Sequence, residues 1–223
     1  ALLAWFGHST PAPRPALTQL ISAWWGEVWA GAAVFGWRQP WASTDIPDDV
    51  RRNRPSRQRG VVLVHGFVCN RGLWNPWMSS LRMRDRAFVA VNLEPIWGSI
   101  DEYVTLIDAA VERVQDVTGL PPVVVAHSMG GLATRAWLRD RDADARVHRV
   151  ITVGTPHHGT WLGRFALSAN GRQMRTASPW ITRLAAQESA ARRSAFTCFF
   201  GHCDNIVFPA ATATLEGAEN RHL

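Results

Sequence analysis

Apolar residues repeat at helical spacing from residue 17 to residue 32, and this periodicity predicts an N-terminal helix. One face of that helix carries six apolar residues: Leu17, Leu20, Ile21, Trp24, Val28 and Ala32. Trp25 and Trp29 widen the face, and Glu27 is the only charged residue between Leu17 and Trp37. The predicted helix is therefore far more apolar than an ordinary surface helix.

Three interpretations of this helix stay open: a helix packed on the body of the protein, an interfacial membrane helix, or a membrane span. Its length approaches the roughly 20 residues of a bilayer span, but Gln19, Glu27 and the glycines argue against one. Tryptophan favours both membrane interfaces and grooves in proteins. Gln39-Pro40 ends the helical pattern, and residues 47–59, rich in proline and arginine, are typical of a linker.

After Gly60, short apolar runs alternate with amphipathic stretches, which predicts the α/β class. The runs that predict buried strands are VVLV (61–64), AFVAVNL (87–93), PPVVVAHS (121–128), RVITVGT (149–155) and AFTCFFG (195–201). Helical spacing predicts helices over 101–118 and about 129–139, the first with two acids in its first turn and Gly119 after its last. Strands that alternate with helices indicate a mostly parallel sheet with helices on both faces.

The charged residues exclude several chemistries. The chain has 24 basic residues against 18 acidic ones, and all 24 are arginine. Without lysine there is no Schiff base, no Ser-Lys dyad and no Walker A site. Five of these arginines (51, 52, 54, 57 and 59) fall in the linker, so the rest of the chain is nearly neutral. Such a run is typical of a solvated linker, with contact to anionic lipid headgroups as the alternative.

Cysteine, metal and nucleic-acid signals are weak. Cys69, Cys198 and Cys203 form neither a disulfide framework nor a CxxC pair, and we expect buried free thiols. No ligand cluster suggests a metal. No motif for nucleic-acid binding accompanies the arginines, so we expect no nucleic-acid partner.

The hexapeptide AHSMGG at 126–131 is the strongest chemical signal in the chain. It directly follows the run PVVV and opens a predicted helix, as a nucleophile elbow does. So tight a turn strains its central residue and requires small residues two positions away on either side. Ala126 and Gly130 meet that requirement, although Ala126 departs from a strict G-x-S-x-G pattern. We therefore predict Ser128 as a nucleophile at the carboxyl edge of the sheet, with a structural turn as the alternative.

A nucleophilic serine needs hydrogen-bond donors for the negative charge that develops on the attacked carbonyl oxygen. The first strand ends in His65-Gly66-Phe67. A backbone N–H after such a strand acts together with the N–H of the residue that follows the serine. We therefore predict an oxyanion hole from the amides of Phe67 and Met129, and we interpret His65 as a structural loop residue rather than the base.

Five segments of residues 60–223 match a known family in their order and spacing. They are VVLVHGF, VNLEP with GSID, VVVAHSMGGLATRAWLR, ITVGTPHHGT and HCDNIVFP. With them the chain resembles a bacterial lipase/esterase of the α/β-hydrolase superfamily. The resemblance implies the α/β-hydrolase fold and a triad in the order serine, acid, histidine.

The resemblance also implies the position of the acid. In the family the acid follows the next-to-last core strand in a D-x-[VI]-V-x-P context, which CDNIVFP matches. Asp204 is therefore the predicted acid. Asp142 and Asp144, in RDRDADAR, are weaker candidates because that segment is typical of a solvated turn.

The resemblance places the base after one more strand, in a glycine-rich loop. His222 is the only histidine after Asp204, but residues 219–223 resemble the beginning of that strand, so the C-terminal strand and helix look truncated. We expect the catalytic histidine beyond Leu223, with His222 as the alternative. The remaining candidates, of which the first two more often shape the pocket, are His157, His158 and His202.

These expectations divide the chain into a Trp-rich helical segment with an Arg-rich linker (1–59) and a hydrolase domain (60–223). The resemblance implies a cap- or lid-like insertion at about 157–190. The predicted activity is hydrolysis of carboxylic esters, lipid or acylglycerol esters among them, through an acyl-enzyme and without metal or cofactor. The alternatives are an acyltransferase or lipid deacylase on the same fold, and a non-catalytic membrane-associated protein.

The expected partner is a small-molecule or lipid ester substrate. Residues 17–59 are the candidate for contact with a membrane surface. The sequence leaves the compartment open, with membrane association as one option.

Overall fold

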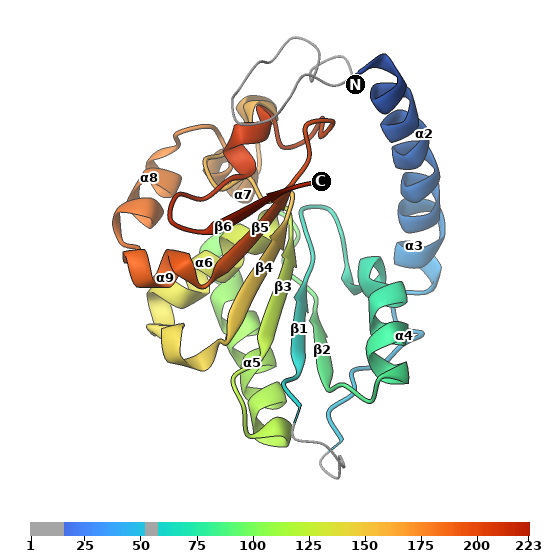
Figure 1. The fold of residues 1–223 in the computed structure, drawn as a ribbon, viewed down its shortest axis with the longest axis vertical. Helices are drawn as coiled ribbons and strands as arrows, with labels where there is room; N and C mark the ends of the chain where they lie inside the picture. Colours follow the sequence, from blue (N-terminus) through green and yellow to red (C-terminus); the bar gives the residue numbers. More distant parts are fainter. Residues whose placement is uncertain (1–15, 52–57) are drawn as a thin grey trace.

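A parallel β-sheet forms the centre of the molecule, with helices on both of its faces (Figure 1). The structure is a computed structural model that describes residues 16–51 and 58–223. The strands are β1 (Val61–Val64), β2 (Phe88–Val91), β3 (Val123–His127), β4 (Arg149–Val153), β5 (Phe196–Phe200) and β6 (Glu219–His222). They lie in the order β2-β1-β3-β4-β5-β6, and each neighbouring pair is parallel. Each predicted apolar run contains one strand, and β6 confirms the strand expected to begin at 219.

The helices confirm the predicted periodicities. In chain order they are α2 (Leu17–Ala33), η1 (Val34–Arg38), α3 (Gln39–Trp41), η2 (Arg71–Trp74), α4 (Asn75–Met83), η3 (Ile100–Tyr103), α5 (Val104–Thr118), α6 (Met129–Arg141), η4 (Ala143–Arg146), η5 (Trp161–Phe165), α7 (Ala169–Gln173), α8 (Pro179–Ala186), α9 (Ala190–Ser194) and η6 (Ala210–Ala213). The predicted helix 101–118 is η3 followed by α5. It ends at Gly119, which has a left-handed φ of 67°.

Side chains of the strands alternate between the two faces of the sheet, and each face has its own core. Val62 and Val124 face the larger core, which includes side chains of α5 and α6. Leu63 and Val125, one residue out of phase, face the smaller core beneath η2 and α4. Because the central strands are covered on both faces, their sequences are continuous apolar runs.

A buried ion pair joins α6 to the segment after α8. Arg135 donates from Nε and Nη2 to the two carboxylate oxygens of Glu188, at 2.7 and 2.6 Å, and both side chains are 1% exposed. Arg135 also donates from Nη1 to the His157 carbonyl at 2.9 Å. The two-point contact fixes the rotation of α6 against the loop that follows β4.

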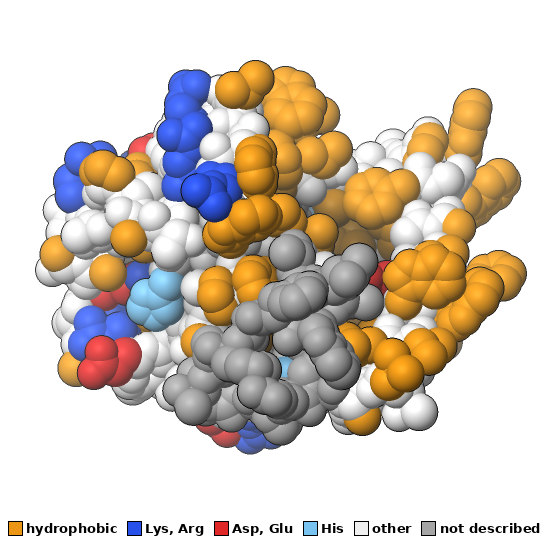
Figure 2. All heavy atoms as spheres, turned by 90° about the horizontal axis from the view of Figure 1, so that it is seen from above, with side chains coloured by type: hydrophobic (Ala, Val, Ile, Leu, Met, Phe, Trp, Pro, Cys, Tyr) orange, Lys and Arg blue, Asp and Glu red, His pale blue; other side chains and the backbone are white. Residues whose placement is uncertain are grey.

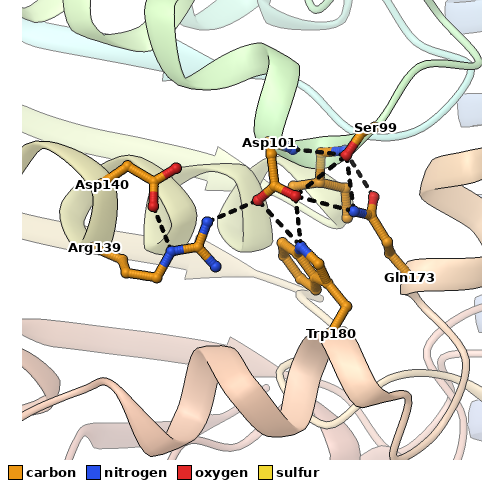
Figure 3. Close-up of polar contacts among 7 residues, drawn as sticks. Ser99, Asp101, Arg139, Asp140, Gln173 and Trp180 are labelled. Atoms are coloured by element: carbon orange, nitrogen blue, oxygen red, sulfur yellow. Dashed lines mark hydrogen bonds and ion pairs between the residues drawn. The ribbon is translucent and has the colours of Figure 1, made fainter.

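Asp101 organises a second polar network on the same side of the sheet (Figure 3). Its carboxylate accepts hydrogen bonds from Arg139 of α6 at 2.8 Å and from Trp180 Nε1 of α8 at 2.9 Å. Gln173 of α7 donates to Ser99 Oγ at 2.8 Å. The second half of the expected cap-like insertion is thus fastened to the body of the protein, and a lid function for this insertion stays a prediction.

The N-terminal helix α2 runs beside the body of the protein (Figure 1). Most of its large apolar side chains are exposed to solvent. Leu20 is its buried residue, whereas six large apolar side chains of α2 are 44–72% exposed: Leu17, Ile21, Trp24, Trp25, Val28 and Trp29. Across residues 16–51 and 58–223, no helix combines the length and the hydropathy needed to cross a bilayer. The predicted apolar face is therefore a surface of the molecule rather than part of its core.

The Arg-rich linker is described at its two ends. Arg51 pairs with Asp49 at 2.8 Å and with Asp85 at 3.1 Å. Arg59 donates to the Pro121 carbonyl at 3.1 Å. Both arginines therefore lie at the amino ends of the strands, and the remaining linker arginines and Trp5 fall outside the described residues.

Glu188 and Asp142 both contact arginine, but we expect neutralisation of the buried Glu188 to destabilise the protein far more than neutralisation of the exposed Asp142. In Glu188→Gln the buried Arg135 charge loses its counter-charge, so we expect the free energy of unfolding to fall by about 3–5 kcal/mol. Asp142→Asn is the matched control, because Asp142 is 95% exposed and contacts Arg192 at 3.4 Å; a change below about 0.5 kcal/mol is expected there. Urea denaturation of both variants measures the free energy of unfolding. Equal losses in the two variants would show that Glu188 is not needed to neutralise a buried Arg135.

Candidate active site

Ser128 occupies a strained turn between β3 and α6. Its backbone has φ 51° and ψ −127°, a conformation that non-glycine residues rarely adopt. The turn is held on both sides, because the Ser128 amide donates to the Val153 carbonyl at 3.0 Å. Its carbonyl accepts hydrogen bonds from the Gly131 amide at 3.0 Å and from Thr155 Oγ1 at 2.9 Å. The strain at this position is the backbone feature predicted for a nucleophile elbow.

Close packing around the turn explains its small residues. A Cβ atom at Gly130 would lie 2.5 Å from the His65 carbonyl oxygen and 2.7 Å from that of Val64. Ala126 is fully buried in the larger core. Position 130 therefore requires glycine, while the position two residues before the serine accepts a methyl group.

The turn after β1 lies directly beside Ser128. A Cβ atom at Gly66 would come within 2.9 Å of Ser128 Cβ, so the two backbones nearly touch. Phe67 follows in this turn, and its ring packs edge-to-face against Trp97 at 5.3 Å. Within the described residues, the amides of Phe67 and Met129 donate no hydrogen bond to another residue. The structure thus brings both predicted oxyanion residues next to the serine.

A cavity of about 400 Å³ lies at the carboxyl ends of β3, β4 and β5, and both Ser128 and Asp204 line it. Most of its remaining walls are apolar, with side chains from Val153, Phe199, Phe200, Ile206, Val207 and Leu223. Glu27 of α2 closes one side. The predicted nucleophile and the predicted acid therefore face the same space, although they lie 76 positions apart in the sequence.

The Asp204 carboxylate is held in place by backbone donors. Its Oδ1 accepts hydrogen bonds from the amides of Ile206 and Val207, at 2.8 and 2.9 Å. Burial raises the pKa of Asp204, the two amides lower it in part, and the negative charge of Glu27 raises it further. A half-buried carboxylate that is fixed in this way can orient an imidazole and stabilise its cation.

Two of the histidines considered as the base, His202 and His222, contact each other. His222 Nε2 lies 2.7 Å from His202 Nδ1, and the rings stack with centroids 4.8 Å apart. His202 lines the cavity, whereas His222 does not. Within the described residues, neither histidine forms a hydrogen bond with Ser128 or Asp204, so the structure does not assemble a triad through either of them.

His65 is a structural residue, as its place before the glycine turn predicts. It is 2% exposed, and its Nε2 accepts a hydrogen bond from the Leu93 amide at 2.9 Å. The proton therefore sits on Nδ1, which donates to the Gly66 carbonyl at 2.8 Å. Burial lowers the pKa of His65 to about 4, so its ring stays neutral and joins the end of β1 to the segment after β2.

The other polar candidates lie away from the cavity. Asp144 pairs with Arg192 at 2.7 Å, and Asp142 is exposed beside it. His157 is fully buried and contacts Thr152 Oγ1 at 3.1 Å. The cysteines are all free, but the expectation that all three are buried is wrong: only Cys198 is buried, and the partly exposed Cys203 lines the cavity. In the part of the chain that the structure describes, no three His, Cys, Asp or Glu side chains are grouped to hold a metal ion.

Two cavity residues escaped the sequence analysis. Glu27 is the lone charge of α2, and this isolation is the signal that could have marked it, because a charge in an apolar helix needs a specific partner. His127, next to the serine, also lines the cavity, and its Nδ1 is buried without a partner among the described residues. No sequence pattern distinguishes His127 from an ordinary strand residue.

Comparisons with known proteins agree with this architecture. Residues 61–218 match the model described as "Alpha/beta hydrolase family". Among solved structures, mature Bacillus licheniformis lipase BlEst2 is 18% identical with a TM-score of 0.66, and the match covers 76% of this chain and 85% of that one. Aspergillus fumigatus lipase B is 19% identical with a TM-score of 0.64, over 83% and 54% of the two chains. A monoacylglycerol lipase of Paleococcus ferrophilus is 15% identical with a TM-score of 0.54, over 73% and 83%. No curated protein matches significantly.

The tight turn predicts opposite effects for two glycine substitutions. Gly130→Ala forces a methyl group against two backbone carbonyls, so we expect a loss of about 1–3 kcal/mol in the free energy of unfolding. Gly26→Ala, in α2, meets nothing within 4 Å and should stabilise the protein by up to about 1 kcal/mol through helix propensity. Chemical denaturation of both variants tests this, and a neutral Gly130→Ala would argue against the close approach.

The hydrogen bonds of His65 predict its titration. Its ring should stay neutral with the proton on Nδ1 until the pH falls close to 4, because burial opposes the cation. NMR of ring-labelled histidine, assigned with a His65→Gln variant, measures this directly. In urea the same ring should titrate near the ordinary value of about 6.5. A midpoint near 6.5 in the folded protein would show that the ring is solvated.

Proposed function

This chain belongs to the alpha/beta hydrolase family, and on that basis we propose that it is a serine hydrolase that cleaves carboxylic esters through an acyl-enzyme. The observation that carries the proposal is the strained turn at Ser128, which opens into the cavity that Asp204 shares. The combination of φ 51° and ψ −127° at Ser128 lies outside the left-handed region that a turn residue such as Asp142 adopts, and it costs about 1–3 kcal/mol.

In the proposed reaction Ser128 Oγ attacks the ester carbonyl while a histidine takes the hydroxyl proton. Negative charge develops on the carbonyl oxygen, and the Phe67 and Met129 amides donate hydrogen bonds to it. The histidine then protonates the leaving alcohol. Water, activated by the same histidine, cleaves the acyl-enzyme. Asp204 keeps the imidazole oriented and stabilises its cationic form.

The base remains the prediction made from the resemblance: a histidine in the segment after β6, with His222 as the alternative. Two observations support the first option. His222 contacts His202 rather than Asp204, and Leu223, at the end of β6, already lines the cavity. A chain that continues from this parallel strand emerges at the edge of the sheet where the base is needed.

Lipid or acylglycerol esters are the proposed substrate class. The cavity walls are mainly apolar, which suits an acyl chain better than a polar acyl group. The structures that this chain resembles include lipases and a monoacylglycerol lipase. These likenesses show the fold alone, so they guide the choice of substrates for testing.

The proposal predicts covalent labelling at Ser128. In the natural full-length protein, a fluorophosphonate probe should modify Ser128 and block hydrolysis of p-nitrophenyl esters. Ser128→Ala should lose the label and at least about three orders of magnitude in kcat/KM. Ser79→Ala, an exposed serine on α4, is the control and should keep both. A folded protein that takes no label would reject the proposal, and ester formation with added alcohols would redirect it toward acyl transfer.

A further inference from the structure

Exposed large apolar side chains gather around the carboxyl edge of the sheet, where the cavity opens (Figure 2). The loops that follow four different strands each expose at least one: Val68, Trp97, Leu167 and Ile206. Leu167 is 85% exposed. Isolated apolar residues are normal on a protein surface, but their concentration around one opening indicates a binding surface.

The N-terminal helix extends this apolar surface, because most of its large apolar side chains are exposed. Only Leu20 of α2 is buried, and polar side chains of the same helix contact the segment after β5. Glu27 accepts a hydrogen bond from Asn205 Nδ2 at 3.3 Å, and Gln19 Oε1 lies 3.4 Å from His202 Nε2. Apart from Leu20, the large apolar side chains of α2 point away from the body, so the exposed face of α2 is uncharged and continues into Trp37. A helix packed on a soluble protein has the reverse orientation.

Arginine side chains lie among the exposed aromatic residues of the loop after β4. The Arg164 guanidinium lies over the rings of Trp161 and Phe165, at 5.1 and 5.8 Å from their centroids. Arg172 donates to the Leu167 carbonyl. Aromatic rings beside cations suit the headgroup region of a bilayer, where indoles and anionic phosphates meet.

We propose that this face docks on the surface of a lipid bilayer, with the cavity of Ser128 and Asp204 opening toward the lipid. We define the docking face as the exposed apolar side chains of α2, η1, α3 and the loops after β1, β2, β4 and β5. The choice of lipid rests on the proposed function. The apolar side chains project from separate loops and a helix, and a fluid surface accommodates such separate side chains. A folded partner would need one continuous complementary face.

The docking face includes only the first part of residues 17–59, the segment that the sequence suggested for membrane contact. Arg51 and Arg59 are anchored at the amino ends of the strands, where they contact Asp85 and Pro121. The docking face surrounds the opposite ends. Residues 17–41 therefore act together with loops of the hydrolase domain, and the ends of the Arg-rich linker lie away from the lipid.

The test measures binding without catalysis. The natural protein with Ser128→Ala is floated with vesicles of diether-linked phosphatidylcholine, with or without diether phosphatidylglycerol, so that no ester can be cleaved. Trp29→Ser and Leu167→Ser remove apolar side chains from two separate elements of the docking face. Each should weaken vesicle binding by about tenfold, as expected for the loss of one buried apolar side chain. Because the elements are independent, a folding defect in one variant leaves the other informative.

Met83→Ser is the matched control, because Met83 is 81% exposed on α4 but lies at the end of that helix nearest the amino end of β2. It should leave vesicle binding unchanged. Arg164→Gln should weaken binding to the anionic vesicles more than to the neutral ones. No vesicle binding by the folded protein, or equal losses in Met83→Ser and Trp29→Ser, would overturn the proposal.

Sedimentation velocity tests whether a second copy of the chain, rather than a lipid surface, covers the docking face. A dimer that Trp29→Ser dissociates, in a protein that does not bind vesicles, would assign the face to a second copy of the chain. None of these measurements depends on hydrolysis. Vesicle binding can therefore be absent while the probe labels Ser128. Vesicle binding without labelling of Ser128 can be recognised in the same way.

Discussion

The close approach of α6 to the end of β1 is the constraint on which the candidate site depends. Gly130 lies so near the carbonyls of Val64 and His65 that no side chain fits between them. This contact forces the chain to turn within a single residue, and Ser128 takes the strain as a positive φ. The same contact brings the Gly66 turn against the serine, so one packing requirement places both the proposed nucleophile and the proposed oxyanion donors.

Polar contacts hold α6 further along its length, and they explain how the strain persists. The buried pair of Arg135 and Glu188 fixes one side of the helix, and Arg139 joins the Asp101 network on another. Strain at a single residue is kept only where the surrounding structure determines its position. The contacts of Trp180 in the same network tie α8 to this framework, so the region behind the serine is rigid while the apolar loops in front of it are exposed.

The cavity and the docking face describe one functional arrangement. Glu27 faces the cavity from α2, on the helix whose other side is apolar and exposed. If the proposed docking on lipid holds, a helix with a polar contact to the cavity and an apolar outer surface links that docking with access to Ser128. In this proposal the N-terminal segment belongs to the substrate-binding edge of the protein.

The sequence by itself determined the strands of the sheet and the position of the tight turn at Ser128. Short apolar runs of β-branched residues such as VVLV favour strands buried on both faces. AHSMGG has the small residues that a tight turn requires two positions before and after Ser128. Asp204 was predicted as the acid through the family resemblance, because nothing local distinguishes it from a loop aspartate. Only the tertiary structure decided that the helical periodicity of residues 17–32 marks an exposed face and that Glu27 belongs to the cavity. Periodicity shows that residues share a face, but only the packing of distant segments shows what that face meets.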